Sequence, residues 1–132
     1  MKRNNRQLTV RTMVLCLLGL MMMMSQNVFA GADIKFTFKE GKMGDGFCEV
    51  RGYFTNNGDM AGEITKAEIT IDVKRNGTIL YSVKKTFDMG HLYVWNGAPY
   101  HTFTVYDSRF KEGTECLLNW YLWWDNVKPI GN

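Results

Sequence analysis

The sequence contains little proline, histidine or cysteine, and it has no long hydrophobic run. Two prolines, two histidines and three cysteines occur among its 132 residues. The longest apolar block, residues 13–24, has twelve residues, whereas a membrane-spanning helix needs about 20. The histidines, His91 and His101, have no cysteine or acid at metal-ligand spacing. We therefore expect no spanning helix, no metal site and no cofactor.

The first 30 residues contain no acid and have the order of a secretory signal peptide. Basic residues come first, and they are Lys2, Arg3, Arg6 and Arg11. The apolar block follows, and then Val28-Phe29-Ala30, with small residues at the −3 and −1 positions of a cleavage site. We predict that residues 1–30 are removed, which leaves no stable membrane anchor. Residues 31–132 are then one secreted or periplasmic domain.

Residues 31–132 have no excess of basic charge. The whole chain has a net charge of +3, but this part holds twelve basic and thirteen acidic residues, a net charge of −1. Its only basic pairs, Lys74-Arg75 and Lys84-Lys85, flank a predicted turn. Because nucleic-acid binding requires a clustered basic face, we expect no nucleic-acid partner.

Helical periodicity is missing after residue 30, and apolar residues alternate with polar ones, which indicates β-strands. The clearest strand is 64–74, which ends at Asn76-Gly77, a pair typical of a type I′ hairpin turn, and returns over 79–87. Residues 89–97 fit either a short edge strand or a loop. The other predicted strands are 34–39, 48–55, 100–106 and 115–125. Six or seven strands in about 100 residues favour an all-β, antiparallel two-sheet sandwich, with a small closed barrel as the alternative.

Two cysteines, Cys48 and Cys116, remain after removal of the signal peptide. Both fall on the inward face of their predicted strands, and a one-residue slip of either strand would turn one thiol to solvent. An even pair in an exported protein indicates a disulfide. Closing this loop of 68 residues would stabilise the fold by roughly 4 kcal/mol. Two buried free thiols are the alternative.

Three segments carry a resemblance to a known family. Residues 50–58, Val-Arg-Gly-Tyr-Phe-Thr-Asn-Asn-Gly, match a strand that ends in an Asn-Gly turn. Residues 64–73 with 76–80 match an amphipathic strand, a turn and a return, and residues 103–105 match the strand that follows the family's Pro-Gly turn. That turn departs from the pattern, because it reads Asn96-Gly97-Ala98-Pro99.

In these segments, about half of residues 31–132, the chain resembles the FxLYD-type and related immunoglobulin-like modules of bacterial envelope proteins. The resemblance implies an immunoglobulin-like β-sandwich that serves for binding or as a spacer. It carries no catalytic residues.

Aromatic residues are unusually frequent, with seven Phe, six Tyr and four Trp in residues 31–132. Trp120 and Trp124 share the inward face with Cys116, so we expect them in the core. Tyr121 and Trp123 lie two residues apart on the outward face of the same strand and point the same way. Tyr93 and Trp95 belong to the apolar segment 89–97, and Tyr53, Tyr100 and Tyr106 extend the set of candidate exposed aromatics. Exposed Tyr and Trp are typical of interfaces.

Catalytic chemistry is weakly supported. His101, Asp107 and Ser108 are the residue types of a hydrolase triad, but no nucleophile-elbow sequence surrounds Ser108, and Asp107-Ser108 is typical of a turn. We therefore expect no catalytic residues and predict that the protein is not an enzyme.

The aromatic pattern favours a binding or accessory module of the cell envelope. We expect it to contact a protein partner through Tyr121, Trp123, Tyr93 and Trp95. A glycan-binding module is an alternative, disfavoured because no polar cluster accompanies these aromatics. The other alternative is a secreted inhibitor or effector-neutralising protein with residues 89–98 as its protruding wedge.

Overall fold

The computed structural model describes residues 2–10, as backbone, and residues 31–127. These residues form seven strands: β1 (Lys2–Val10), β2 (Ile34–Gly44), β3 (Phe47–Asn56), β4 (Ala61–Arg75), β5 (Thr78–Val94), β6 (Tyr100–Tyr106) and β7 (Glu115–Val127). Each predicted strand after residue 30 is present. Among the described residues there is no helix of the length and apolarity needed to cross a membrane.

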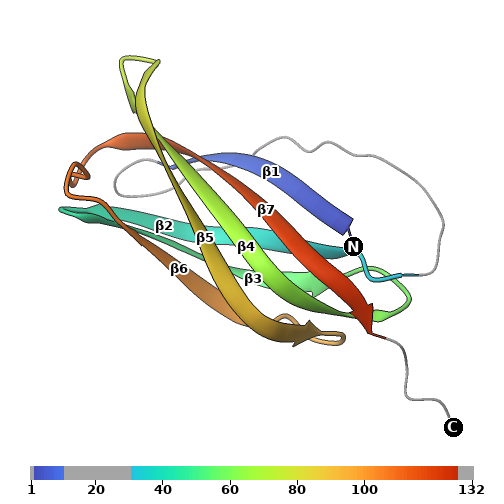
Figure 1. Ribbon diagram of the computed structural model, residues 1–132. Coiled ribbons are helices and arrows are strands. Elements are labelled where there is room, and N and C mark those ends of the chain that lie inside the picture. Colours follow the sequence, from blue (N-terminus) through green and yellow to red (C-terminus); the bar gives the residue numbers. More distant parts are fainter. Residues whose placement is uncertain (1, 11–30, 128–132) are drawn as a thin grey trace, which may run out of the picture.

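The strands form two antiparallel sheets that pack face to face (Figure 1). One sheet has the order β1-β7-β4-β5 and the other has the order β2-β3-β6. The predicted all-β, antiparallel two-sheet sandwich is confirmed. Hairpins join β2 to β3 and β4 to β5, whereas the consecutive strands β6 and β7 lie in different sheets. The last two strands of an immunoglobulin constant domain instead pair within one sheet.

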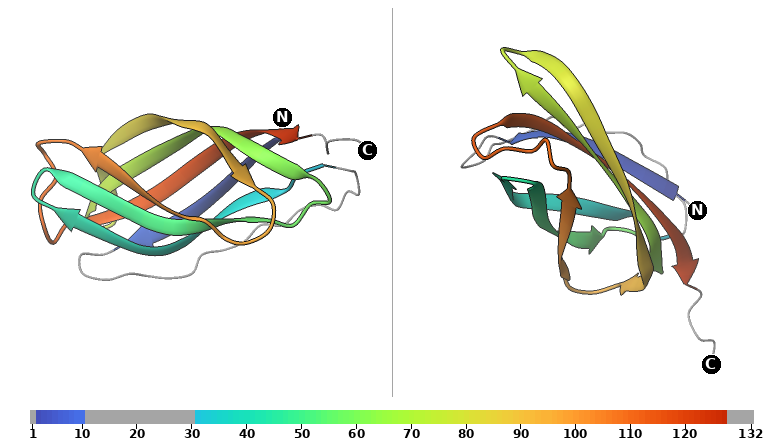
Figure 2. Two further views of the ribbon diagram at one scale, coloured as in Figure 1. Left: turned by 90° about the horizontal axis from the view of Figure 1, so that it is seen from below. Right: turned by 60° about the vertical axis from the view of Figure 1, so that its left-hand side comes forward.

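The tip of the β4–β5 hairpin projects beyond the neighbouring strands, as the right-hand view of Figure 2 shows. Its turn is the predicted Asn76-Gly77, and both residues have positive φ, 51° and 80°. Type I′ turns require this conformation at both central positions, and Asn and Gly adopt it at the lowest steric cost. β5 is longer than predicted, because residues 89–94 continue it to Val94 at the edge of its sheet. Residues 89–94 are thus part of an edge strand, but as the end of β5 and not as a separate short strand, and residues 95–97 form a bend.

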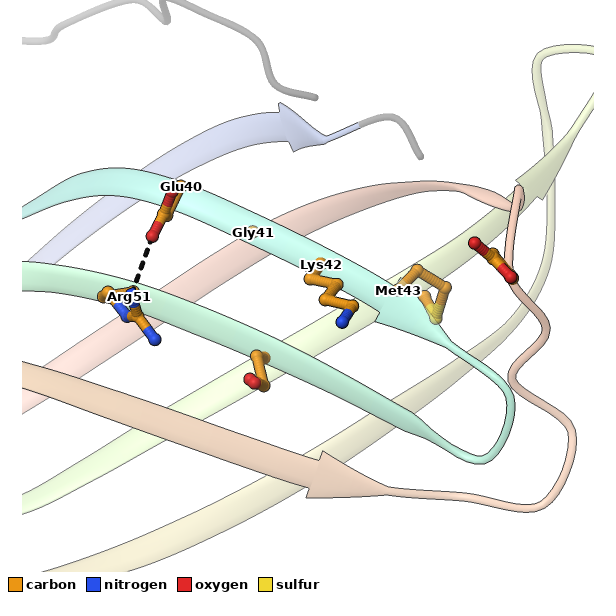
Figure 3. A pocket seen from close by; sticks show the side chains of 7 residues that line it. Glu40, Gly41, Lys42, Met43 and Arg51 are labelled. Carbon is orange, nitrogen blue, oxygen red and sulfur yellow. Dashed lines mark hydrogen bonds and ion pairs between the residues drawn. The ribbon is translucent and has the colours of Figure 1, made fainter. Parts of the chain in front are cut away.

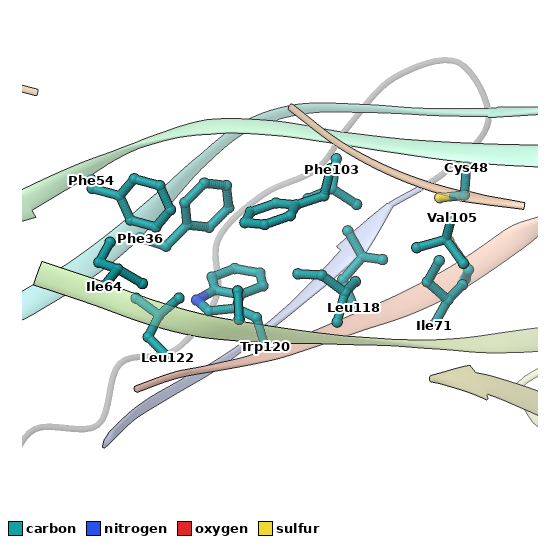
Figure 4. Close-up of a cluster of buried hydrophobic side chains, with 14 of the residues drawn as sticks. Phe36, Cys48, Phe54, Ile64, Ile71, Phe103, Val105, Leu118, Trp120 and Leu122 are labelled. Atoms are coloured by element: carbon teal, nitrogen blue, oxygen red, sulfur yellow. The ribbon is translucent and has the colours of Figure 1, made fainter. Parts of the chain in front are cut away.

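Alternation along the strands forms the core between the sheets. Figure 4 shows the rings of Phe36, Phe54 and Phe103 in a row above Trp120. The Phe36 ring centroid lies 5.1 Å from that of Phe54 and 5.3 Å from that of Trp120. Burying each of these side chains stabilises the fold by roughly 1.5–3 kcal/mol. Trp124 is also buried, so the predicted core role of both tryptophans is confirmed.

β1 is one of the two edge strands of the four-stranded sheet. It pairs with β7 from Lys2 opposite Trp124 to Val10 opposite Cys116. The rest of the predicted signal peptide, residues 11–30 with the cleavage site, lies outside the described residues. Among the described side chains, every member of the buried hydrophobic cluster lies between Ala32 and Trp124. Removal of residues 1–30 and the single domain 31–132 remain predictions.

Candidate binding site

Tyr121 and Trp123 lie on the outward face of β7, as predicted. Their inward neighbours Trp120, Leu122 and Trp124 are buried, while Tyr121 and Trp123 are only half-buried. The two ring centroids are 6.3 Å apart and the rings are tilted by 39°. Successive outward residues of a strand stand on the same side at about this spacing, so the pair presents one continuous aromatic surface.

Charged residues of β4 surround this pair. Lys66 is opposite Trp123 in the register, and its ammonium group lies 5.9 Å from the centre of the indole ring. Glu68 is opposite Tyr121, and its carboxylate lies 3.9 Å from the ammonium group of Lys84 on β5. A cation over an aromatic face contributes about 0.5–1 kcal/mol at exposed sites. The Lys66 contact covers part of the Trp123 ring, which stays half-buried.

Tyr93 joins the same outward face from β5. Glu63 of β4 lies opposite Tyr93 of β5 on one side and opposite Asp125 of β7 on the other. This row of outward residues is next to the row that holds Lys66 and Trp123. Tyr93 is 54% exposed. We call Tyr93, Tyr121, Trp123 and Lys66 the aromatic face. Trp95, which is 40% exposed, follows the end of β5 and lies in the bend at residues 95–97, outside this face.

A bulge in β5 precedes Tyr93, and the sequence analysis missed it. Leu92 pairs with Ile64 and Asp88 pairs with Lys66, so three residues of β5 oppose a single residue of β4. Gly90 and His91 have positive φ, 58° and 60°. Asp88 accepts a hydrogen bond from the Gly90 N–H at 2.9 Å, and Nδ1 of His91 lies 3.2 Å from a carboxylate oxygen of Glu63. Gly90 inside an apolar run was the only sequence signal for it.

The outward face of the three-stranded sheet holds a second aromatic pair beside a hollow. The rings of Tyr53 and Tyr100 lie 5.5 Å apart, and Tyr100 is 62% exposed. The hollow has a volume of about 520 Å³ and is lined by Lys39, Glu40, Arg51, Tyr100, His101 and Thr102. Charged and polar side chains line the hollow beside these aromatics, and charged residues of β4 likewise flank the pair on β7.

A second hollow of about 470 Å³ adjoins the first and shares Glu40 and Arg51 with it (Figure 3). Arg51 donates a hydrogen bond to Glu40 at 2.9 Å and a longer one, of 3.4 Å, to the hydroxyl of Thr102. Lys42 and Met43 also line this hollow. Charged donors and acceptors are thus held at the junction of the two hollows.

Cys48 and Cys116 face each other across the sandwich, from β3 and β7. Both are buried, which confirms the predicted inward faces, but both are free thiols, so the disulfide expected from the sequence is not formed in the structure. A hydrogen bond with the Cys116 thiol and burial raise the pKa of Cys48 far above its usual range. A thiol held protonated in this way is a poor nucleophile. The Cys116 thiol is nevertheless in contact with it.

His101, Asp107 and Ser108 do not form a catalytic arrangement. His101 packs on Phe103 with ring centroids 4.5 Å apart, and burial lowers the pKa of His101. Asp107 follows the end of β6, six positions further along the chain, which is about 20 Å of extended backbone. The carboxylate of Asp107 accepts hydrogen bonds from the side chain and the N–H of Arg109. It is therefore engaged in the turn after β6.

No family model, no curated protein and no solved structure matches this chain. The resemblance to FxLYD-type modules therefore stays a prediction, and the function must be argued from the surfaces described above.

Proposed function

We propose that residues 31–132 are an exported, non-enzymatic binding module of the cell envelope whose aromatic face binds a protein partner. The observation that carries this proposal is the half-buried Tyr121–Trp123 ring pair on β7, on the same outward face of the sheet as the exposed Tyr93 of β5. Tyr and Trp have few rotatable bonds, so they bury large areas at low entropic cost. Trp and Tyr are accordingly enriched among the residues that dominate binding energy.

Charges around the aromatic face fit the same role. Lys66 and Glu68 flank the ring pair, and Glu63 and Asp88 stand near Tyr93 on the outward side of the sheet. Protein interfaces commonly have an aromatic centre and a polar rim that stays partly solvated. Trp95, beyond the end of β5, is an additional contact at the periphery in this proposal.

The test is affinity capture with two matched double variants. Immobilised protein would be exposed to a solubilised envelope extract, alongside Tyr121→Ala/Trp123→Ala and Tyr53→Ala/Tyr100→Ala. The second variant removes an aromatic pair from the opposite outer face, so it controls for general loss of aromatic surface. We expect one protein to be retained by the wild type and the control and lost by the β7 variant. Equal retention on all three columns, or none on any, would contradict the proposal.

A glycan-binding module is the second candidate, and the Tyr53–Tyr100 pair favours it. Sugar rings stack on exposed aromatic side chains, and Arg51 and Glu40 beside Tyr100 can hydrogen-bond sugar hydroxyls in the adjoining hollow. Calorimetric titration with soluble envelope oligosaccharides would test it. Binding that is lost in Tyr100→Ala and kept in Trp123→Ala would establish this candidate in place of the first.

Oxidation of the cysteine pair is a further part of the proposal. In an exported protein, we expect the Cys48 and Cys116 thiols to be oxidised to a disulfide that links the two sheets. The two thiols would give up two electrons and two protons to a disulfide of an envelope thiol oxidoreductase, which is reduced to its dithiol form through a mixed disulfide. The hydrogen bond between the two thiols supports this step, because it holds the two side chains against each other.

A further inference from the structure

The outer edge of β7 is occupied in the 132-residue chain by residues that export is predicted to remove. β1 pairs with β7 over nine positions, and its residues 2–10 belong to the predicted signal peptide. β1 lies alongside β7 at the margin of the sheet (Figure 2). Removal of residues 1–30 would leave the backbone N–H and C=O groups on this edge without strand partners.

This edge lacks the features that normally protect exposed strands. Residues 116–124, Cys-Leu-Leu-Asn-Trp-Tyr-Leu-Trp-Trp, contain no Lys, Arg or Pro, the residue types that commonly prevent edge pairing. The opposite edge of the same sheet differs, because β5 carries exposed Lys84 and Lys85 and the bulge at Gly90 and His91. Of the two edges, the β7 edge is therefore the one suited to accept another strand.

We propose that, after removal of residues 1–30, the β7 edge binds an extended segment of a partner protein as an antiparallel strand. This inference rests on the proposed function and names its binding mode: main-chain pairing along the edge next to the aromatic face. Strand addition of this kind derives affinity from backbone hydrogen bonds and specificity from alternate side chains.

The register of β1 defines the chemistry of that segment. It places Lys2, Asn4 and Arg6 opposite Trp124, Leu122 and Trp120, respectively. The three β7 residues are buried and face the core, so apolar residues at the opposing positions would extend the hydrophobic face. The partner segment therefore has apolar residues at alternate positions, which β1 itself has only at Leu8 and Val10.

A single extended segment fits this edge better than a second copy of the chain. β2 contacts both β1 and β7 and so lies beneath their junction. A twofold pairing of β7 with β7 would bring the β2 strand of the second copy into the same space, because the two copies use identical surfaces. A segment without a folded layer beneath it avoids this overlap.

Synthetic peptides provide the test. The protein is the processed chain, residues 31–132, beside the full chain and a full-chain variant Leu8→Pro/Thr9→Pro in which β1 is disrupted. The probes are peptide 2–10, the same peptide with Lys2→Val, Asn4→Val and Arg6→Val, and a control peptide with Leu8→Pro and Thr9→Pro. Binding is measured by tryptophan fluorescence and located by amide hydrogen exchange.

We expect the valine peptide to bind the processed chain about tenfold more tightly than peptide 2–10, since three cross-strand pairs improve. Its binding should slow exchange in residues 116–124, and the proline peptide should not bind. The full chain should bind no peptide, whereas its Leu8→Pro/Thr9→Pro variant should.

Four results would overturn the inference. The first is equal affinity for all three peptides, and the second is slowed amide exchange in a strand other than β7. The third is slowed amide exchange of β7 in a dimer of the processed chain without peptide. The fourth is a processed chain that stays unfolded with and without peptide. The last result would make residues 2–10 an integral strand. If partner capture by the aromatic face fails while peptide binding is intact, the proposed role of the aromatic face is wrong. The proposal of strand addition at the β7 edge then stands.

Discussion

At the scale of single residues, Asp107 shows how the turn after β6 is held. Its carboxylate accepts hydrogen bonds from Nε, Nη2 and the backbone N–H of Arg109, each at 2.9 Å. These bonds lower the pKa of Asp107 to about 2, because they stabilise the charged form. The Arg109 guanidinium also lies 4.1 Å from the centre of the Tyr81 ring. A residue expected only to begin a turn thus anchors a loop to β5.

The lowered pKa predicts a pH-dependent contribution of Asp107 to stability. A carboxyl group with a lower pKa in the folded state stabilises the fold above its unfolded pKa, usually 3.8, and loses this effect as the pH falls toward the folded value. We expect the stability difference between wild type and Asp107→Asn to be constant above about pH 5 and to vanish between about pH 4 and 2. Urea unfolding at several pH values measures it.

Arg109→Gln is the control for this prediction. It removes the guanidinium and keeps the carboxylate and the backbone N–H of residue 109, so the acid-dependent part of the stability should become smaller without vanishing. A wild-type advantage over Asp107→Asn that persists unchanged at pH 2 would show that the contribution is not electrostatic.

At the scale of elements, the bulge in β5 links backbone conformation to the aromatic face. His91 has a φ of 60°, which is uncommon for any residue other than glycine and especially unfavourable for a β-branched one. Its contact with Glu63 of β4 holds the bulge against the neighbouring strand. Leu92 returns to the core and Tyr93 to the outer face directly afterwards. The bulge therefore sets which side of the sheet Tyr93 occupies.

Two substitutions at His91 test this role. Both His91→Val and His91→Gly remove the contact with Glu63, but only valine is strained at positive φ. Strain of this kind costs on the order of 1–3 kcal/mol, and the extra entropy of glycine costs roughly 0.5–1 kcal/mol. We expect the valine variant to be about 1 kcal/mol less stable in urea unfolding. Equal stabilities would mean that the bulge rearranges without cost.

At the scale of the whole molecule, the Cys48–Cys116 pair lies where a covalent link would join the two sheets. Cys48 is on β3 and Cys116 is on β7, so a disulfide would restrain the sandwich as a unit. Oxidation would close a loop of 68 residues and stabilise the fold by roughly 4 kcal/mol. The aromatic face and the β7 edge would both be held more firmly, since Cys116 begins the β7 segment that carries them.

We predict that protein isolated from the envelope has an intact mass two hydrogen atoms below that of the reduced chain. The oxidised protein should also unfold at a higher urea concentration than the reduced protein. Cys48→Ser/Cys116→Ser should be insensitive to reductant. Two thiols that react with maleimide in the denatured, unreduced protein would refute the disulfide and leave the free thiols of the structure as the native state.

The alternation of apolar and polar residues was enough to predict which residues face the core and which face solvent, because side chains alternate with a period of two along any strand. Trp120, Trp124 and both cysteines point inward as predicted, and Asn76-Gly77 forms the turn. Tertiary structure decided which strands are neighbours. It placed Tyr93 on the same face as Trp123, extended β5 past Phe87 and set Tyr100 beside Arg51 and Glu40. Those arrangements depend on pairing between segments far apart in the chain, where the cost of loop closure and the fit of whole sheets decide, and no local pattern encodes them.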